Sequence, residues 1–302
     1  MATVTSAAPR SAVRPTGVIA ERRIKPSAVI GKILFYLLVV TILFYTIFPF
    51  YWMAVSSLKP DSDLFTTPLN YLPKPLSLGH MRYVLNSGEF LRALRNSAFV
   101  ATSTVLLSLL IGSFAAYAIG RMKFRGKSPI MYLILSLTMF PQVAVLGSLY
   151  QMINRVHLFN RWPACTISYL TFTLPFTVWV LANFFKAMPG ELEEAALVDG
   201  ATPFQAFLKI LLPLALPGLV TTGLLAFIAA WNEFLFAVTF TQDSRARTAP
   251  VAIASFSGNT QFDYPWGNIM AAAVIVTVPL VVLVLIFQRK LLAGLTAGAV
   301  KG

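Results

Sequence analysis

The sequence predicts an all-α integral membrane protein with six transmembrane helices. Of its 302 residues, 57% are hydrophobic and only 12% are charged, whereas a soluble domain averages roughly 25% charged residues. The chain contains six apolar blocks, each long enough to supply the roughly 20 helical residues that cross a hydrocarbon core of about 30 Å. These blocks are continuous and lack the alternation of barrel strands, so helices are favoured.

The predicted spans divide the chain into three parts. Residues 1–29 are rich in Ala, Ser, Pro and Arg and are expected to form a basic, disordered tail. The first apolar block is too long for a signal peptide and ends without a small-residue cleavage site, so it is expected to stay in the membrane. A membrane domain over 30–290, with a long loop over 188–213, then precedes a C-terminal tail over 291–302. The six predicted spans are 30–55, 97–119, 129–152, 163–185, 214–240 and 267–287.

Lysine and arginine residues predict the orientation of the spans. They gather in the N-terminal tail, in the RMKFRGK segment after the second span, and near the C-terminus. Six spans place these three segments on one side, which the positive-inside rule makes cytoplasmic, so both termini are expected in the cytoplasm. Trp52, Trp162 and Trp266 then fall at outer ends of spans, where an aromatic belt is expected. The outer loop over 57–93 is either a docking site for an external partner or a plain connector.

The loop GELEEAALVDGATPFQAFLKILLP over 190–213 departs from the basic character of the chain, whose formal net charge is +13. Carboxylates in its first turn complement a helix dipole, and Gly200 stands where a left-handed cap would end a first short helix. On that helix Leu192, Ala195, Ala196 and Asp199 share one face. The loop holds these acids, out of eleven in the whole chain: Glu191, Glu193, Glu194 and Asp199.

A second helix is predicted directly after the first. Thr202, Pro203 and Gln205 have the spacing of a capping box with proline at the first helical position, and Pro213 is expected to end the helix or kink it into the fifth span. Apolar side chains then recur at helical spacing along one stripe: Phe204, Phe207, Leu208, Leu211 and Leu212.

This pair of helices predicts docking to another protein. It combines an apolar face, the small Ala195–Ala196 pair and carboxylates that are available to a cation, as expected for a helix that fits a groove. The alternative is an amphipathic helix resting on lipid. Such helices normally carry Lys and Arg on their polar face, so the acids favour a protein partner with a basic surface.

The same loop resembles the signature of a known family. Glu194-Ala195-Ala196, three residues, Gly200, nine residues, then Ile210-Leu211-Leu212-Pro213 is similar to the EAA motif, EAA-x3-G-x9-I-x-L-P. That motif marks the membrane subunits of binding-protein-dependent ATP-binding cassette (ABC) importers. The resemblance implies a type I ABC importer permease fold in which this loop is the coupling helix of a separate ATPase subunit.

Residue roles follow from the resemblance. Glu194 would pair with a basic residue of the ATPase, and Phe204 and Phe207 would brace the pair of helices. Small residues would permit close docking. The coupling residues implied are Glu194, Ala195, Ala196, Asp199, Gly200, Ala201, Phe204, Phe207, Ile210, Leu212 and Pro213.

Three further segments resemble the G-subunit branch of maltose/trehalose-type carbohydrate importers: the AWNEF sequence over 230–234, the TAPVAI sequence over 248–253 and the closing run over 294–302. In that branch the C-terminal tail reaches the ATPase, which implies this role for Thr296, Gly298 and Lys301. The implied substrate is trehalose, maltose or a related α-linked oligosaccharide, with glycerol-3-phosphate or another polyol as the alternative. The implied partners are a second permease subunit, a homodimeric cytoplasmic ATPase, an extracytoplasmic sugar-binding protein and membrane lipid, in a bacterial or archaeal cytoplasmic (inner) membrane.

The chain is not expected to hydrolyse ATP itself. A Walker A loop requires a glycine five residues before Gly126-Lys127-Ser128, after a strand, but position 121 is arginine and the flanks are membrane spans. ATP and Mg²⁺ are therefore expected on a partner subunit, and no cofactor is expected here. One cysteine, Cys165, and two histidines predict neither a disulfide nor a metal site. The basic residues flank apolar spans, so no nucleic-acid partner is expected.

Glu233 is the one acid inside a predicted span, next to Asn232. Buried ionisable residues in spans usually face protein or water. Three interpretations stay open: a pathway or gating group, a proton relay, and an interhelical hydrogen bond with Asn232 or a nearby Ser or Thr. A stand-alone secondary transporter would require inverted repeats and paired charges, and a membrane enzyme would require clustered His, Asp or Glu. The sequence shows neither arrangement.

Overall fold

The computed structural model describes residues 26–256 and 264–299, with side chains over 30–256 and 264–290. Within this part of the chain every regular element is helical, as predicted. The chain divides into two units, 1–49 and 50–302, which are described separately. Most of the predicted basic tail lies outside the described residues.

Helix α1 (Pro26–Ser57) begins four residues before the predicted first span, and its residues 26–49 form the described part of the first unit. Over residues 30–49 nearly all of its large apolar side chains are exposed, as expected of a helix that faces lipid or another subunit. The hydroxyls of Thr41 and Thr46 donate to the carbonyls of Leu37 and Ile42, each at 2.8 Å. These bonds satisfy both polar groups within the helix.

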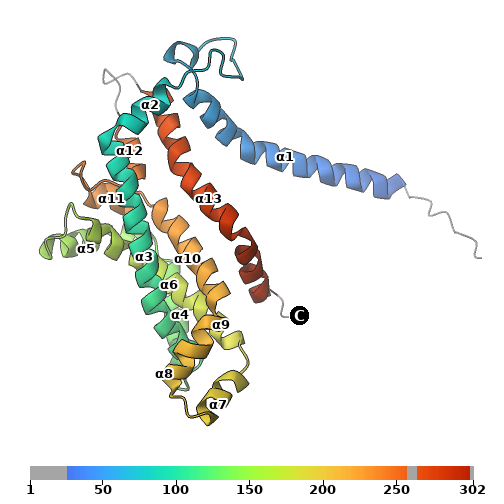
Figure 1. Cartoon of the computed structure of the whole chain (residues 1–302), viewed down its shortest axis with the longest axis vertical. Coiled ribbons are helices and arrows are strands. Elements are labelled where there is room, and N and C mark those ends of the chain that lie inside the picture. The colour runs from blue at the N-terminus through green and yellow to red at the C-terminus, as the bar shows by residue number, and fades with distance from the viewer. Residues whose placement is uncertain (1–25, 257–263, 300–302) are drawn as a thin grey trace, which may run out of the picture. The chain divides into compact units, whose positions relative to one another are not determined.

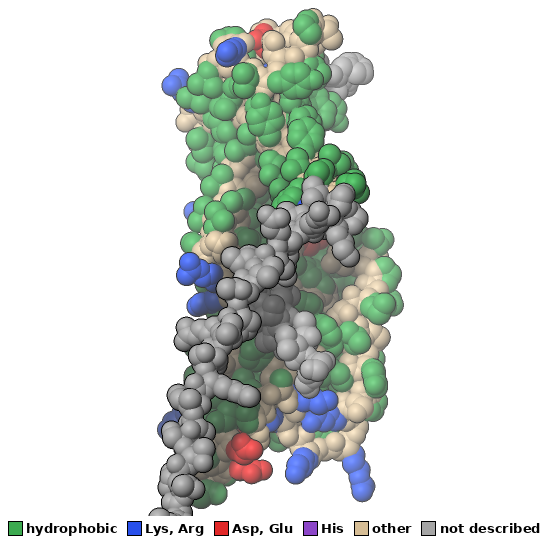
Figure 2. Space-filling view, turned by 90° about the vertical axis from the view of Figure 1, so that its right-hand side faces the viewer, with side chains coloured by type: hydrophobic (Ala, Val, Ile, Leu, Met, Phe, Trp, Pro, Cys, Tyr) green, Lys and Arg blue, Asp and Glu red, His purple; other side chains and the backbone are tan. Residues whose placement is uncertain are grey.

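The second unit contains three further helices long and apolar enough to cross a membrane. They are α3 (Gly88–Gly120), α6 (Trp162–Ala187) and α13 (Trp266–Ala299). Two bent helix pairs bring the number of candidate spans in the described residues from four to as many as six. Hydrophobic side chains cover much of the face drawn in Figure 2, which fits lipid contact.

The third predicted span is not one continuous helix. It consists of α4 (Lys127–Thr138) and α5 (Gln142–Arg155), which are bent by 93° relative to each other. Pro141 stands before α5 in an extended conformation. Proline lacks the N–H that would continue α4, so the helix is interrupted at this position. Pro175 and Pro279, in contrast, lie inside the uninterrupted α6 and α13.

The fifth predicted span is also broken. Helix α10 (Leu216–Trp231) ends at Trp231, and α11 (Leu235–Phe240) begins after a three-residue turn. The predicted continuous span over 214–240 was therefore wrong at its outer part. The turn between the two helices contains Glu233, whose carboxylate caps the beginning of α11.

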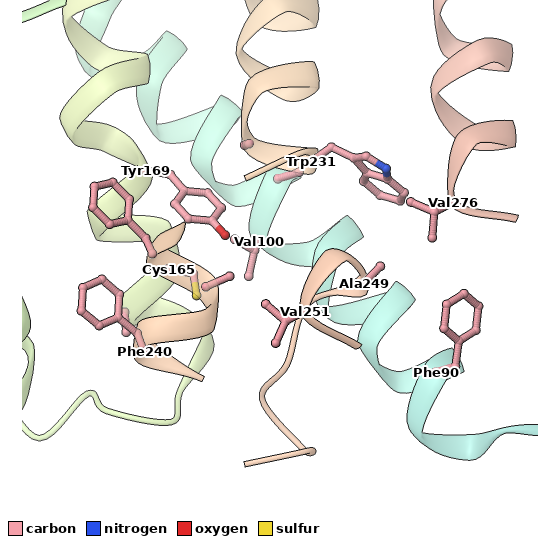
Figure 3. Packing of buried hydrophobic residues seen from close by; sticks show 14 of the residues in the cluster. Phe90, Val100, Cys165, Tyr169, Trp231, Phe240, Ala249, Val251 and Val276 are labelled. Carbon is pink, nitrogen blue, oxygen red and sulfur yellow. The ribbon is translucent and has the colours of Figure 1, made fainter. Parts of the chain in front are cut away.

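Helices α3, α6 and α10 pack side by side and form the centre of the unit (Figure 1). Small residues let α3 approach α6 closely, since a Cβ added to Gly112 would meet the Thr177 side chain at 2.6 Å. Ser108 and Thr173 share a buried hydrogen bond of 2.8 Å across this interface. Figure 3 shows the core near the break, where Cys165 and Tyr169 of α6 lie beside Val100, Trp231 and Phe240.

Short elements cover the N-terminal end of α3: α2 (Gly79–Asn86) and α12 (Ala249–Ala254). The short helix η1 (Asp61–Asp63) lies beside α2, where Asp61 Oδ1 is 3.6 Å from His80 Nε2. They are fixed by polar contacts. The Ser97 hydroxyl accepts from the Ala249 N–H at 2.8 Å, and His80 Nδ1 lies 2.8 Å from Asn268 Oδ1. The opposite end of α3 carries the loop over 188–213.

Candidate functional site

The loop over 188–213 forms the two predicted short helices. The first is α7 (Glu191–Val198), and Gly200 follows it with a φ of +85°. The Ala201 N–H donates to the Ala196 carbonyl at 2.9 Å, and the Gly200 N–H donates to the Leu197 carbonyl at 3.1 Å. These two bonds form a Schellman motif, so the predicted left-handed cap is confirmed.

The second helix begins with the predicted capping box. The Gln205 N–H donates to Thr202 Oγ1 at 3.2 Å, and the Thr202 N–H donates to Gln205 Oε1 at 2.9 Å. The helix runs through α8 (Pro203–Ala206), a π-helical turn η2 (Phe207–Leu211) and α9 (Leu212–Leu214). The helix ends at Leu214, one residue after Pro213, and the chain then bends by 72° into α10, close to the predicted end.

An aromatic cluster anchors the second helix to the spans. Phe207 is 1% exposed, and its ring centroid lies 4.7 Å from Tyr117, 5.4 Å from Phe114 and 5.9 Å from Phe185. Phe204 is exposed and stacks on Phe114 at 6.2 Å. Both phenylalanines therefore pack toward α3, and Phe207 also toward α6, rather than only between the two short helices.

The acids of the loop separate into two kinds. Glu193 is used within the chain, because its Oε1 accepts from the Tyr117 hydroxyl at 2.8 Å and its Oε2 lies 3.3 Å from Arg121 Nε. Glu191, Glu194 and Asp199 are exposed. The expectation that the acids as a group serve a partner is corrected for Glu193, which holds the loop to α3.

The outward edge of α7 is apolar. Val198 is 87% exposed, and Leu197 is 43% exposed. Ala195 is exposed, whereas its neighbour Ala196 is buried under the chain. Of the predicted small pair, only Ala195 is therefore accessible from outside. Among the other predicted residues, Ala201, Ile210 and Leu212 are half-buried, and Pro213 is exposed.

Arg121 and Tyr117 are residues that the sequence interpretation missed. The sequence interpretation used Arg121 as one of four cations in a basic segment and as the residue that excludes a Walker A loop, and it assigned Arg121 no contact with the loop over 188–213. The available signal was its position, since it directly follows the second span while Lys123, Arg125 and Lys127 stand further from it. Its side chain is only 11% exposed, whereas Lys123 and Arg125 are exposed.

Glu233 caps α11. Its carboxylate is buried and accepts from the Phe236 N–H at 2.7 Å and from the Ala237 N–H at 3.1 Å. The Asn232 side chain instead donates to the Ile228 carbonyl at 2.9 Å. The Asn232 amide therefore does not pair with Glu233, and the bonds from the carboxylate to backbone groups fix the turn between α10 and α11.

The predicted C-terminal tail lies partly outside the described residues. Thr296 and Gly298 lie within α13, which continues to Ala299, so the expected C-terminal tail is helical there. Their side chains and Lys301 lie outside the described residues.

Within the part of the chain that was searched, no group of three His, Cys, Asp or Glu could hold a metal ion. Cys165 is buried, as expected.

Comparison with curated proteins finds close relatives of this chain. It is 43% identical to the trehalose transport system permease protein SugB of Mycobacterium tuberculosis, over 85% of this chain and 93% of that protein. It is 42% identical to the trehalose/maltose transport system permease protein MalG of Thermococcus litoralis, over 85% of this chain and 92% of that protein.

A solved structure supports the fold. The chain resembles a crystal structure of a bacterial ABC transporter involved in the import of the acidic polysaccharide alginate, with a TM-score of 0.76 and 21% identity. The match covers 88% of this chain and 98% of that chain, and it confirms the predicted permease fold. Residues 108–296, which include the whole loop over 188–213, match a family of transport proteins. The chain belongs to this family, the inner membrane components of binding-protein-dependent transport systems.

Proposed function

We propose that this chain is a membrane-spanning subunit of an ATP-driven importer that moves a sugar into the cytoplasm. The observation that carries the proposal is the loop over 188–213. It presents α7 with an apolar edge and exposed carboxylates, while buried contacts to α3 and α6 hold it in place. A rigidly held, outward-facing helix is suited to receive motion from a partner.

The ATPase that drives import is a separate subunit in this proposal. Glu194 pairs with one of its basic residues, and Ala195 and Gly200 let its surface come close to α7. No atom lies within 4 Å of a Cβ added to Gly200, so the glycine leaves open space on the outward side. Phe204 and the edge formed by Leu197 and Val198 supply apolar contact area. The tail with Thr296, Gly298 and Lys301 reaches the same ATPase.

The remaining partners complete the assembly. A second permease subunit forms the other half of the pathway, and a sugar-binding protein docks on the segments over 57–93 and 241–265. With six spans, counting each bent pair as one, both termini of the proposed subunit lie in the cytoplasm, in agreement with the positive-inside rule. Arg121 of the basic segment contacts Glu193 of the loop, so these two predicted cytoplasmic segments lie at the same end of α3.

The proposed transport cycle uses these contacts. ATP closes the ATPase dimer, α7 moves with it, and the spans open the sugar pathway to the outside; hydrolysis returns it to the inside. The chain is accordingly a transport subunit, with ATP and Mg²⁺ on the partner. Three parts are proposed: the basic tail 1–29, the membrane domain 30–290 and the tail 291–302.

Trehalose, maltose or a related α-linked oligosaccharide is the proposed substrate. Two relatives named for trehalose or trehalose/maltose transport are 43% and 42% identical over most of the chain. A polyol derivative is the second candidate, because a permease of a sulfoquinovosyl glycerol transport system in Agrobacterium fabrum is 36% identical over 90% of this chain. Uptake of labelled trehalose, maltose and glycerol-3-phosphate by cells with and without the gene separates the two classes.

Co-purification tests the assembly. The tagged chain is expressed with the transporter genes that neighbour it, and we expect an ATPase subunit to be retained. Glu194→Lys is expected to weaken this retention at least tenfold, and Gly200→Pro to abolish it, because proline cannot adopt the positive φ of residue 200. Glu89→Lys is the matched control, since Glu89 is exposed in the first turn of α3, at the opposite end of that helix. Retention that ignores both loop variants would reject the coupling role.

A further inference from the structure

The cytoplasmic end of α3 carries two residues that touch almost every segment of the loop over 188–213. Tyr117 and Arg121 are four residues apart, so they lie on the same face of the helix. Tyr117 is 9% exposed and the Arg121 side chain 11%. Neither residue belongs to the motif that marks the loop.

Arg121 joins the end of α6 to the start of α7. Its two terminal nitrogens donate to the carbonyls of Met188 at 3.0 Å and Pro189 at 2.8 Å, just past α6. Its Nε lies 3.3 Å from Glu193 Oε2, in the first turn of α7. A cation at a helix C-terminus and an acid at a helix N-terminus both complement the helix dipoles. The planar guanidinium holds its donors in a rigid fork, whereas the ammonium of lysine is a compact point charge without that geometry.

Tyr117 connects the second helix of the loop to the same end of α3. Its hydroxyl donates to Glu193 Oε1 at 2.8 Å, and its ring packs against Phe207 at 4.7 Å. One turn away, a Cβ added to Gly120 would lie 3.0 Å from the Ala182 carbonyl. The end of α3 is therefore packed against both α6 and the loop without space between them.

We infer that Arg121 and Tyr117 are positioning residues that carry a displacement of α7 into α3. The chain itself connects the loop only to α6, which precedes it, and to α10, which follows it. Without these contacts a push on α7 would reach α3 only through side-chain packing. This inference rests on the proposed coupling function of the loop.

Arg121 has a simpler explanation, which is charge for membrane topology. That explanation predicts that any cation of the basic segment would serve equally. Arg125 is exposed in the same segment, so Arg125→Gln removes the same charge without touching the loop. It is the matched control for Arg121→Gln. Tyr117→Phe provides a second test, since it keeps the ring on Phe207 and removes only the hydroxyl bound to Glu193.

The experiment measures the distance between α7 and the far end of α3 in the purified complex. Spin labels are placed on cysteines at Glu191 and Arg92, which are both exposed; the native Cys165 is buried and is not expected to label. In the wild-type background the distance distribution is expected to stay the same with and without ATP, because α7 and α3 move together. In Arg121→Gln it is expected to shift or broaden with ATP, and labelled trehalose moved per ATP is expected to fall about tenfold, the scale of a coupling free energy between sites. Arg121→Lys is expected to restore part of this ratio.

Each outcome decides the inference. A wild-type chain that retains no ATPase would reject the proposed function and the inference with it. An assembled Arg121→Gln complex with an unchanged distance and an unchanged sugar-to-ATP ratio would overturn the inference alone, as would equal losses in Arg121→Gln and Arg125→Gln. If Arg121→Gln does not assemble, Tyr117→Phe is expected to assemble with a reduced ratio, and a normal ratio in Tyr117→Phe would then overturn the inference.

Discussion

The loop over 188–213 and the turn between α10 and α11 each use one glutamate to hold an irregular segment, but in different surroundings. Glu193 in the loop is 21% exposed and has a cation and a phenol as partners. Glu233 in the turn is 7% exposed and accepts from two backbone N–H groups. Among the described residues, no lysine or arginine pairs with Glu233.

The difference in burial and in partners indicates what each carboxylate does. A pair near water is screened and contributes little to stability, so Glu193 chiefly sets the position of α7 relative to α3. A buried acceptor that caps a helix cannot be replaced by water without rearrangement, and the N–H groups that it leaves unpaired are costly. Glu233 therefore determines whether the turn exists, whereas Glu193 determines where the loop lies.

The largest effect is expected from Glu233→Leu. Two buried N–H groups lose their acceptor, at about 1–3 kcal/mol each, so the unfolding temperature of the purified chain should fall strongly and uptake should be lost. Glu233→Gln keeps one acceptor oxygen and should lose less. Asn232→Ala is the control, because that side chain is exposed. If Glu233→Leu and Asn232→Ala unfolded at the same temperature, Glu233 would not be required for the turn between α10 and α11.

Gly200→Val should have the next largest effect. The positive φ at Gly200 costs a residue with a Cβ about 1–2 kcal/mol, and β-branching adds to this. No side chain is displaced, because the space around Gly200 is open. Gly190→Ala is the control, with a φ of −65° and equally open surroundings. ATP-driven uptake should fall for Gly200→Val only, and Gly200→Asn should retain more uptake than Gly200→Val, since asparagine tolerates this conformation.

Glu193→Gln should have a smaller effect on stability than Glu233→Leu. The glutamine can still accept from Tyr117, while the ion pair with Arg121 is lost, at about 0–1 kcal/mol for a partly exposed pair. Thermal unfolding of the two variants at low and high salt measures this. The difference between Glu193→Gln and wild type should shrink as salt rises, and the Glu233→Leu difference should not. A salt-independent loss at Glu193 would show that the pair acts as a buried one.

Glu194→Gln should have the smallest effect on the isolated chain. The Glu194 side chain is exposed and forms no hydrogen bond or ion pair with the described residues, so the unfolding temperature of the chain alone should not change measurably. Retention of the ATPase should fall, because only the partner uses this carboxylate. A comparison of Glu193→Gln and Glu194→Gln in both assays tests whether neighbouring acids serve opposite sides of the interface. If the two variants gave the same results in both assays, Glu193 and Glu194 would have the same role.

The sequence specified much of this protein by local rules. Gly200 and the Thr202–Gln205 capping box marked the ends of two short helices, because a left-handed cap and a reciprocal cap depend on residues within one turn. The apolar blocks gave the helical membrane class, because a hydrocarbon core admits few other structures. The spacing from Glu194 to Pro213 indicated the family, because the motif is a pattern within one short segment.

Only the tertiary structure decided which partners each residue has. Glu193 and Glu194 look alike in the sequence, and their difference arises because Arg121, distant in the chain, lies beside one of them. Pro141 breaks a helix while Pro175 does not, since packing by neighbouring helices determines whether a proline is tolerated. Glu233 is a single acid inside a predicted span in the sequence, and only the fold shows that its carboxylate caps α11. Local spacing determines caps and spans, whereas contacts between distant segments depend on how the helices pack.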